Sequence, residues 1–273
     1  MSPDPVVIDS HLHVWQADSD YPNPSVTTVS PVCDVPIELL IEYMDELAIE
    51  RAVLVQPMFP HEDNSYVVDC CQRLPARLAV ICVVDPNVPG ADQRLRSWHE
   101  RGCRGLRLRP RMASEESCFG DSSTFPLWAT ASDLGMVVSV LANTQHVATI
   151  KALADRFPDA TLVVDHLAHP NLSCADRQPL MELAACPNVI MKISGFPYFA
   201  VEPYPYVDCR PLTEAIYAEF GPQRMMWGSD FPHILLQSGY LRSVRLLERL
   251  LPDLNAEDLA TIRYHNAKRL YWD

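Results

Sequence analysis

The sequence lacks any uninterrupted apolar run of the roughly 18 residues that a membrane-spanning helix requires. Its first residues, Met1–Pro5, have neither the basic nor the apolar segment of a secretory signal peptide. Basic residues are also scarce: 22 Lys and Arg stand against 35 Asp and Glu, and the net charge of −13 disfavours a general nucleic-acid-binding surface. We therefore expect a cytoplasmic protein that acts on a small-molecule substrate, with no nucleic-acid and no membrane partner.

The nine cysteines contain no Cys-x-x-Cys pair. Several lie inside apolar runs, as Cys82 does in residues 80–84 (VICVV). An odd number of cysteines in such places is typical of small buried thiols in a reducing compartment, and it disfavours a disulfide framework or a zinc knot. The chain must then fold around an ordinary hydrophobic core. Its 273 residues, 48% of them hydrophobic, suffice for one large domain.

Eight short apolar runs alternate with segments of helical periodicity along the chain. The runs cover residues 6–12, 51–57, 78–84, 104–109, 136–142, 160–166, 188–194 and 224–229. The expected helices cover residues 38–47, 65–73, 91–101, 124–134, 145–157, 179–185, 211–220, 239–251 and 256–270. Eight βα units predict an α/β fold, a single (β/α)8 TIM barrel domain over residues 1–273 with long loops at its C-terminal face. A doubly wound sheet is the alternative, but no glycine-rich fingerprint follows the first run.

Polar residues at the carboxyl ends of these runs are candidates for chemistry, because the active sites of such barrels lie at that face. The first run ends in His11 and His13, which point to the same side of a strand because side chains alternate. Asp230 follows the eighth run. Strands one and eight are neighbours in a closed barrel, so these three side chains should lie together. A hydrogen-bonded histidine pair and a helix N-cap are the structural alternatives.

The fourth run ends in Arg107 and Arg109, which share one face, and Arg111 follows beyond Pro110. In an acidic chain such a cluster suits a bidentate clamp for a substrate carboxylate, although strand arginines can instead face outward and pair with helix carboxylates. Asp165 and His166 end the sixth run, and Lys192 near the end of the seventh is expected to be an ion-pair partner inside the barrel. The insertions after the strands add candidate substrate contacts: His61, Tyr21 and Tyr198.

Taken together, three motifs resemble the amidohydrolase superfamily. They are Asp9-x-His11-x-His13 on the first strand, residues 165–167 (DHL) on the sixth and residues 227–233 (WGSDFPH) on the eighth. They are most similar to its amidohydrolase-2 branch, which contains hydrolases of pyrone-dicarboxylate, fucono- and sulfomuconolactones. The resemblance implies that Asp230 takes a proton from the attacking water. It also implies that His11, His13 and His166 hold a metal or polarise the scissile carbonyl, and that arginines hold substrate carboxylates.

Whether a metal is required stays open at this point. Superfamily sites usually add a carboxylated lysine on strand four or a histidine on strand five. Here strand four ends in arginines and residues 138–143 read VSVLAN, so both positions depart from that pattern. His11, His13, His166 and Asp230 could still hold one divalent cation, for which zinc is the best match. The lactonase branch also includes metal-independent members.

The sequence therefore predicts a hydrolase that opens a small carboxylated lactone with water activated by Asp230. A zinc-dependent decarboxylase of the same superfamily and an amide or cyclic-imide hydrolase are the alternatives. A non-catalytic ligand-binding barrel would have no need of an aspartate beside a His-x-His pair. The identity of the lactone and the oligomeric state are left open.

Overall fold

Eight parallel strands form one sheet in which each strand pairs with the next along the chain. Their bounds are β1 Val7–Leu12, β2 Ile49–Val55, β3 Leu78–Val83, β4 Gly105–Leu108, β5 Val137–Val140, β6 Leu162–Val164, β7 Val189–Ile193 and β8 Met225–Trp227. Past the end of β8 the chain returns to β1: the Asp230 N–H donates to the His11 carbonyl at 2.8 Å and the His13 N–H to the Phe231 carbonyl at 2.7 Å. The predicted (β/α)8 barrel is confirmed.

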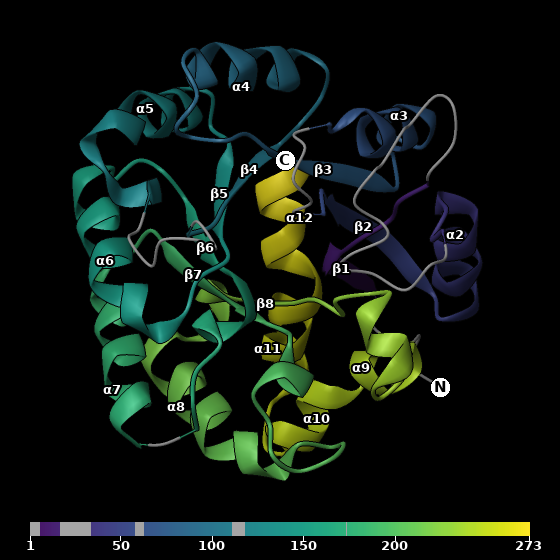
Figure 1. Cartoon of the computed structure of the whole chain (residues 1–273). Coiled ribbons are helices and arrows are strands. Elements are labelled where there is room, and N and C mark those ends of the chain that lie inside the picture. The colour runs from purple at the N-terminus through teal and green to yellow at the C-terminus, as the bar shows by residue number, and fades with distance from the viewer. Residues whose placement is uncertain (1–5, 17–33, 58–62, 111–117, 173) are drawn as a thin grey trace.

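Helices surround the strands on the outside of the barrel (Figure 1). The structure, a computed structural model, describes residues 6–16, 34–57, 63–110, 118–172 and 174–273. In this part of the chain the α-helices are α2 Ile37–Glu46, α3 Ser65–Arg73, α4 Ala91–Glu100, α5 Phe125–Asp133, α6 Val147–Arg156, α7 Cys174–Glu182, α8 Arg210–Phe220, α9 Tyr240–Val244, α10 Leu246–Leu250, α11 Ala256–Ala260 and α12 Asn266–Tyr271. None of these helices combines the length and hydropathy that a bilayer span needs.

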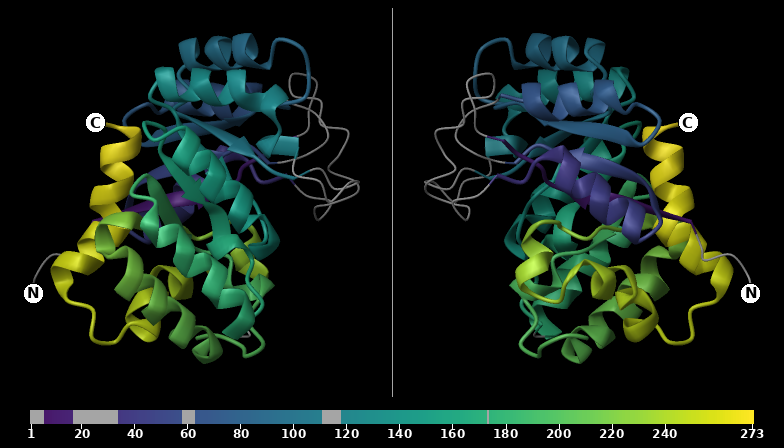
Figure 2. Two further views of the ribbon diagram at one scale, coloured as in Figure 1. Left: turned by 90° about the vertical axis from the view of Figure 1, so that its left-hand side faces the viewer. Right: turned by 90° about the vertical axis from the view of Figure 1, so that its right-hand side faces the viewer.

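The barrel interior is filled with aliphatic side chains. They form a cluster separate from the larger core between strands and helices: Ile8, Val53, Val55, Ala79, Ile81, Val137, Val163, Ile190 and Met226. Tyr271 of α12 belongs to this cluster and packs at the beginnings of the strands. Helix α12 thus closes the N-terminal end of the barrel (Figure 2). The active site is expected at the opposite end, where the strands finish.

Several predicted elements differ from the structure, among them the helix predicted over 239–251, which is divided into α9 and α10. The helix predicted over 179–185 also differs, because α7 begins at Cys174 and holds Pro179 in its interior. The predicted helix over 256–270 is interrupted by a π-helical turn at Thr261–His265. The sixth run ends as a strand at Val164, because residues 165–168 form a 3-10 turn in which His166 has a positive φ of 51°. Because the strand ends at Val164, this turn directs the side chains of Asp165 and His166 toward the site.

Candidate active site

Two histidines at the end of β1 lie side by side in the barrel. His11 is within β1 and His13 follows its last residue. The ring centroids are 5.0 Å apart, the rings are perpendicular, and both side chains are buried. His13 Nδ1 lies 2.7 Å from the Val55 carbonyl oxygen. A carbonyl can only accept, so His13 carries a proton on Nδ1 and directs Nε2 toward the interior of the site.

The turn after β8 packs directly against His11. A Cβ at Gly228 would lie 2.6 Å from the His11 Cβ, so this position requires glycine. The buried carboxylate of Asp9 joins the two segments, because it accepts the Ser229 N–H at 2.9 Å and the Tyr240 hydroxyl at 2.6 Å. Burial raises the pKa of Asp9 to about 6. The first residue of the Asp-x-His-x-His motif therefore fixes β1 to the turn that carries Asp230.

Asp230 points at both histidines of β1. Its backbone has a φ of 62°, in the left-handed region that aspartate tolerates better than most residues. Its Oδ1 lies 3.4 Å from His13 Nε2 and 3.7 Å from His11 Nε2. Burial alone would raise the pKa of this carboxyl, but interactions with His166, His13 and His11 hold it well below the usual value. Asp230 is therefore ionised at neutral pH.

Beneath the histidines lies a fully buried network around Asp165. Its Oδ1 accepts from Lys192 Nζ at 3.0 Å and from the Ser139 hydroxyl at 2.7 Å, and its Oδ2 accepts from Arg107 Nε at 3.0 Å. Lys192 Nζ also lies 3.2 Å from His11 Nδ1, and Arg107 Nη2 lies 3.4 Å from His11 Nε2. Both ring nitrogens of His11 are thus faced by the nitrogen of a cationic side chain.

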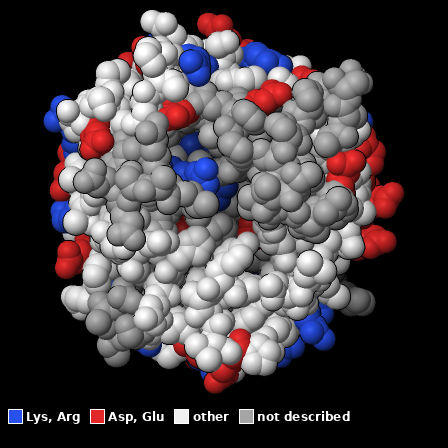
Figure 3. All heavy atoms as spheres, viewed as in Figure 1, with Lys and Arg blue, Asp and Glu red and all other residues white. Residues whose placement is uncertain are grey.

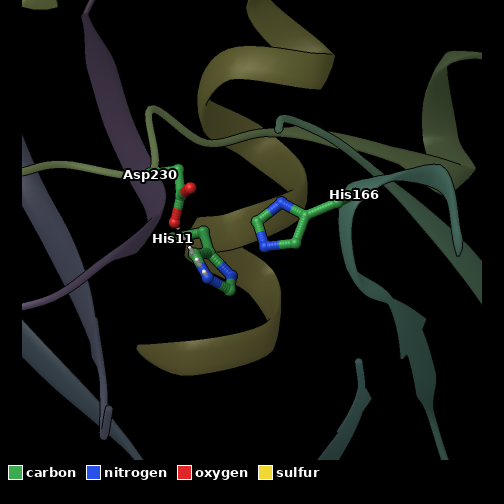
Figure 4. A group of neighbouring side chains, drawn as sticks. All are labelled: His11, His166 and Asp230. Atoms are coloured by element: carbon green, nitrogen blue, oxygen red, sulfur yellow. Dashed lines mark ion pairs between the residues drawn. The ribbon is translucent and has the colours of Figure 1, made fainter. Parts of the chain in front are cut away.

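His166 enters the site from the turn after β6 (Figure 4). Its Nδ1 is 2.8 Å from the Ser194 hydroxyl, and a Cβ at Gly195 would lie 2.7 Å from its ring, so the start of the loop after β7 is shaped around this imidazole. Burial lowers the pKa of His166 to about 3. The imidazole is therefore neutral at physiological pH and can offer one N–H and one lone pair.

Tyr198 covers the carboxylate of Asp230. It lies in the short 3-10 turn Phe196–Tyr198, and its hydroxyl donates to Asp230 Oδ2 at 2.5 Å. Its ring packs edge-on against His166 at 5.8 Å, although 51% of the side chain remains exposed. Burial and the neighbouring Asp230 raise the pKa of this phenol, so it stays protonated and donates. With Oδ2 occupied, Oδ1 is the oxygen that faces the histidines.

The structure thus brings together Asp230, His11, His13, His166 and Tyr198 among the residues predicted from sequence. Arg107 is not at the mouth, because it pairs with Asp165 and is only 3% exposed. Arg109 lies just beyond β4 and is half-buried. The remaining candidates, Tyr21, His61 and Arg111, lie outside the described residues. Figure 3 shows this face of the molecule hollowed near its centre, with basic side chains inside the hollow.

Two residues, Lys192 and His233, make contacts in the site that their positions in the sequence did not predict. Lys192 is the ion-pair partner that we expected, but it also reaches His11. His233 lies in the turn after Asp230, and its ring is 5.7 Å from that of His13 and 6.2 Å from Trp15. The signal for His233 was its place in the WGSDFPH motif, three residues after the candidate base.

A family model described as Amidohydrolase (Amidohydro_2) matches residues 8–272. The chain belongs to the amidohydrolase family. It is 28% identical to an L-fucono-1,5-lactonase of Burkholderia ambifaria over 232 residues, 82% of this chain and 80% of that protein. It is 27% identical to a 4-sulfomuconolactone hydrolase of Hydrogenophaga intermedia over 278 residues, 96% of this chain and 88% of that protein.

A solved structure of an amidohydrolase from Burkholderia multivorans with bound zinc is also similar to this chain. The TM-score is 0.77 at 26% identity, and the match covers 97% of this chain and 99% of that one. Members of this superfamily often use a metal, which raises the question of where this amidohydrolase could hold one.

Two overlapping groups of side chains in this amidohydrolase could hold a cation. We call His11, His166 and Asp230 the inner triad, and His13, Asp230 and His233 the outer triad; in each, the ligand atoms all lie within 4.8 Å of one another. Imidazole nitrogens and carboxylate oxygens suit zinc. The lone pair of His13 Nε2 also faces an ionised carboxylate oxygen at 3.4 Å, an arrangement that calls for a proton or a cation between them. The donor set therefore fits a single divalent cation.

Proposed function

We propose that this amidohydrolase is a lactonase, a hydrolase that opens a small carboxylated lactone by adding water to the ring ester. The observation that carries the proposal is the ionised Asp230 carboxylate, held against His11 and His13 where the barrel strands end. The names of the two relatives place lactones among the substrates of similar chains. That similarity supports the same reaction class for this one.

Asp230 is the general base in the proposed reaction. Water is a poor nucleophile, and an ionised carboxylate can accept its proton as the water oxygen attacks the lactone carbonyl carbon. When the bond to the ring oxygen breaks, the protonated Asp230 returns the proton to that oxygen, which leaves a hydroxy acid. The Tyr198 hydroxyl on Oδ2 holds the carboxylate with Oδ1 toward the reacting groups.

The attack converts the carbonyl oxygen into an oxyanion, which donors must stabilise. His11, His13 and His166 converge with Asp230 and are the candidates for this role. Arg107 Nη2 at His11 Nε2 and Lys192 Nζ at His11 Nδ1 add positive charge to this part of the site, which favours a developing oxyanion. Asp230 and the histidines of one triad would hold a divalent cation, zinc by its donor set, which when bound supplies Lewis-acid polarisation.

The carboxylate of the substrate needs a partner at the mouth of the barrel, and we propose Arg109, which follows the last residue of β4, for this role. We expect Arg109→Met to raise KM about 10- to 100-fold for a carboxylated lactone, from the loss of a charge-assisted hydrogen bond. KM for a neutral lactone should hardly change. Arg94→Met on the exposed side of α4 is the control. Equal effects on charged and neutral lactones would contradict the clamp.

Proton release at fixed pH tests the proposed function directly. The purified protein is assayed against a panel of carboxylated and neutral lactones, with and without chelator. We expect turnover on a carboxylated lactone. If the whole panel is silent, with or without added zinc, the protein is not a lactonase; release of carbon dioxide from an aromatic acid would then identify a decarboxylase.

The structure gives the decarboxylase alternative little support. That chemistry generally relies on a firmly held zinc, to which superfamily members contribute a histidine of strand five. The inward position of β5 is instead Ser139, and its hydroxyl donates to Asp165. Arg107 and Lys192 pair with the same carboxylate. Charged side chains therefore fill the region beside His11 in which further metal ligands would be expected.

A further inference from the structure

The inner and outer triads share Asp230 but differ in their electrostatic surroundings. In the inner triad, His11 has Lys192 Nζ 3.2 Å from one ring nitrogen and Arg107 Nη2 3.4 Å from the other. A cation bound to His11 Nε2 would have to displace the Arg107 guanidinium. It would then lie near two buried cationic side chains that share a single carboxylate, Asp165, as their partner. Repulsion between like charges in a buried site therefore disfavours a cation at this nitrogen.

The outer triad has no such neighbour. Among the described residues, no hydrogen bond or ion pair brings a lysine or arginine nitrogen to His13, Asp230 or His233. His13 is already arranged as a ligand: its Nδ1 donates to a backbone carbonyl, which fixes the tautomer and aims Nε2 at Asp230 Oδ1. A histidine ligand held by its second nitrogen in this way is the usual arrangement around protein-bound metals.

His233 supplies the third donor from the solvent side. It follows Asp230 by three residues, so one turn carries both groups. Its ring packs between those of His13 and Trp15, at centroid distances of 5.7 and 6.2 Å, which limits its motion without using its nitrogens. No hydrogen bond from its side chain to another described residue is present. The imidazole is therefore available to a ligand.

We propose that the outer triad of His13, Asp230 and His233 is a divalent-cation site of the zinc class, and that Lys192 and Arg107 keep a cation out of the inner triad. Three protein ligands leave one tetrahedral position at the mouth of the barrel. His11 and His166 then remain free of metal and act only as hydrogen-bonding groups. This inference concerns cation binding and does not depend on the lactone chemistry.

Cobalt titration of the full-length, chelator-treated protein tests the site without any substrate. Bound Co²⁺ is measured by its visible absorption and, for stoichiometry, by equilibrium dialysis. We expect one Co²⁺ per wild-type chain. His233→Ala, a change in an exposed side chain, should weaken binding by about tenfold or more through the loss of a ligand. His169→Ala, in a half-buried histidine that belongs to neither triad, is the matched control and should leave binding unchanged.

A second comparison separates the two triads. His166→Asn removes an inner-triad nitrogen ligand and should leave cobalt affinity within twofold of wild type, with folding checked by circular dichroism. The proposal is overturned if His233→Ala binds cobalt as tightly as wild type, or if His233→Ala and His169→Ala weaken it equally. It is also overturned if the wild-type protein binds no cobalt. Each of these outcomes leaves the proposed lactonase activity to be judged by its own assay.

Discussion

Replacing Asp230 with asparagine should lower kcat on the lactone substrate by about 10²- to 10⁴-fold, the range that a positioned general base contributes. Asparagine has nearly the same shape and still accepts a hydrogen bond from Tyr198, but it cannot take a proton from water. The wild-type carboxyl is ionised at neutral pH because its pKa is held well below the usual value. Steady-state kinetics measure the loss, and substrate binding should be largely retained because the surrounding side chains remain.

The control for this prediction is Asp133→Asn, the same chemical change at an exposed position of helix α5. It should leave kcat and KM unaltered. An Asp230→Asn enzyme that kept a near-normal kcat would show that another group activates the water. The proposed mechanism would then be wrong even if the lactonase activity itself were established.

Asp165→Asn should lower the free energy of unfolding by about 3–5 kcal/mol, the usual cost of removing one partner from a buried ion pair. Lys192 is fully buried and Arg107 nearly so, and Asp165 is the carboxylate that pairs with both of them. Urea unfolding measures the difference. Asp155→Asn is the control, because its ion pair with Lys151 lies on the exposed surface of α6 and should contribute nothing measurable.

The effect of Asp165 should not depend on pH across the neutral range. Burial would raise the pKa of this carboxyl, but Lys192, His11 and Arg107 hold it well below the usual value. A depressed folded-state pKa contributes stability that is present above the unfolded pKa of about 3.9 and is lost as the pH falls through the folded pKa. The stability that wild type gains from the ionised Asp165 carboxylate should therefore be constant from about pH 5 to 8.

A double variant tests the cause of that destabilisation. If uncompensated positive charge is responsible, Lys192→Met in the Asp165→Asn background should recover part of the lost free energy, because one of the two unpaired cations is gone. A double variant less stable than Asp165→Asn alone would show that Lys192 stabilises the barrel by contacts other than its pair with Asp165.

The amino-acid sequence by itself determined the barrel and the centre of its site. Eight apolar runs separated by helical segments predicted eight βα units, and the lack of a glycine-rich fingerprint after the first run favoured a barrel over a doubly wound sheet. Closure then brings the first and last strands together. For that reason His11, His13 and Asp230 could be grouped from positions more than 200 residues apart. Strand alternation also placed both histidines on one side.

Only the tertiary structure decided which partner each polar side chain takes. Strand periodicity places Arg107 and Arg109 on one face of their strand but does not say which way that face points. The structure turns Arg107 inward, where it and Lys192 both pair with Asp165 because a buried charge must be compensated. The sequence also did not show that Tyr198 contacts Asp230, because Tyr198 lies in a loop without periodicity. Nor did it show that the turn after Asp230 brings His233 next to His13. Those contacts depend on distances through space between separate loops, and no local pattern in the sequence encodes them.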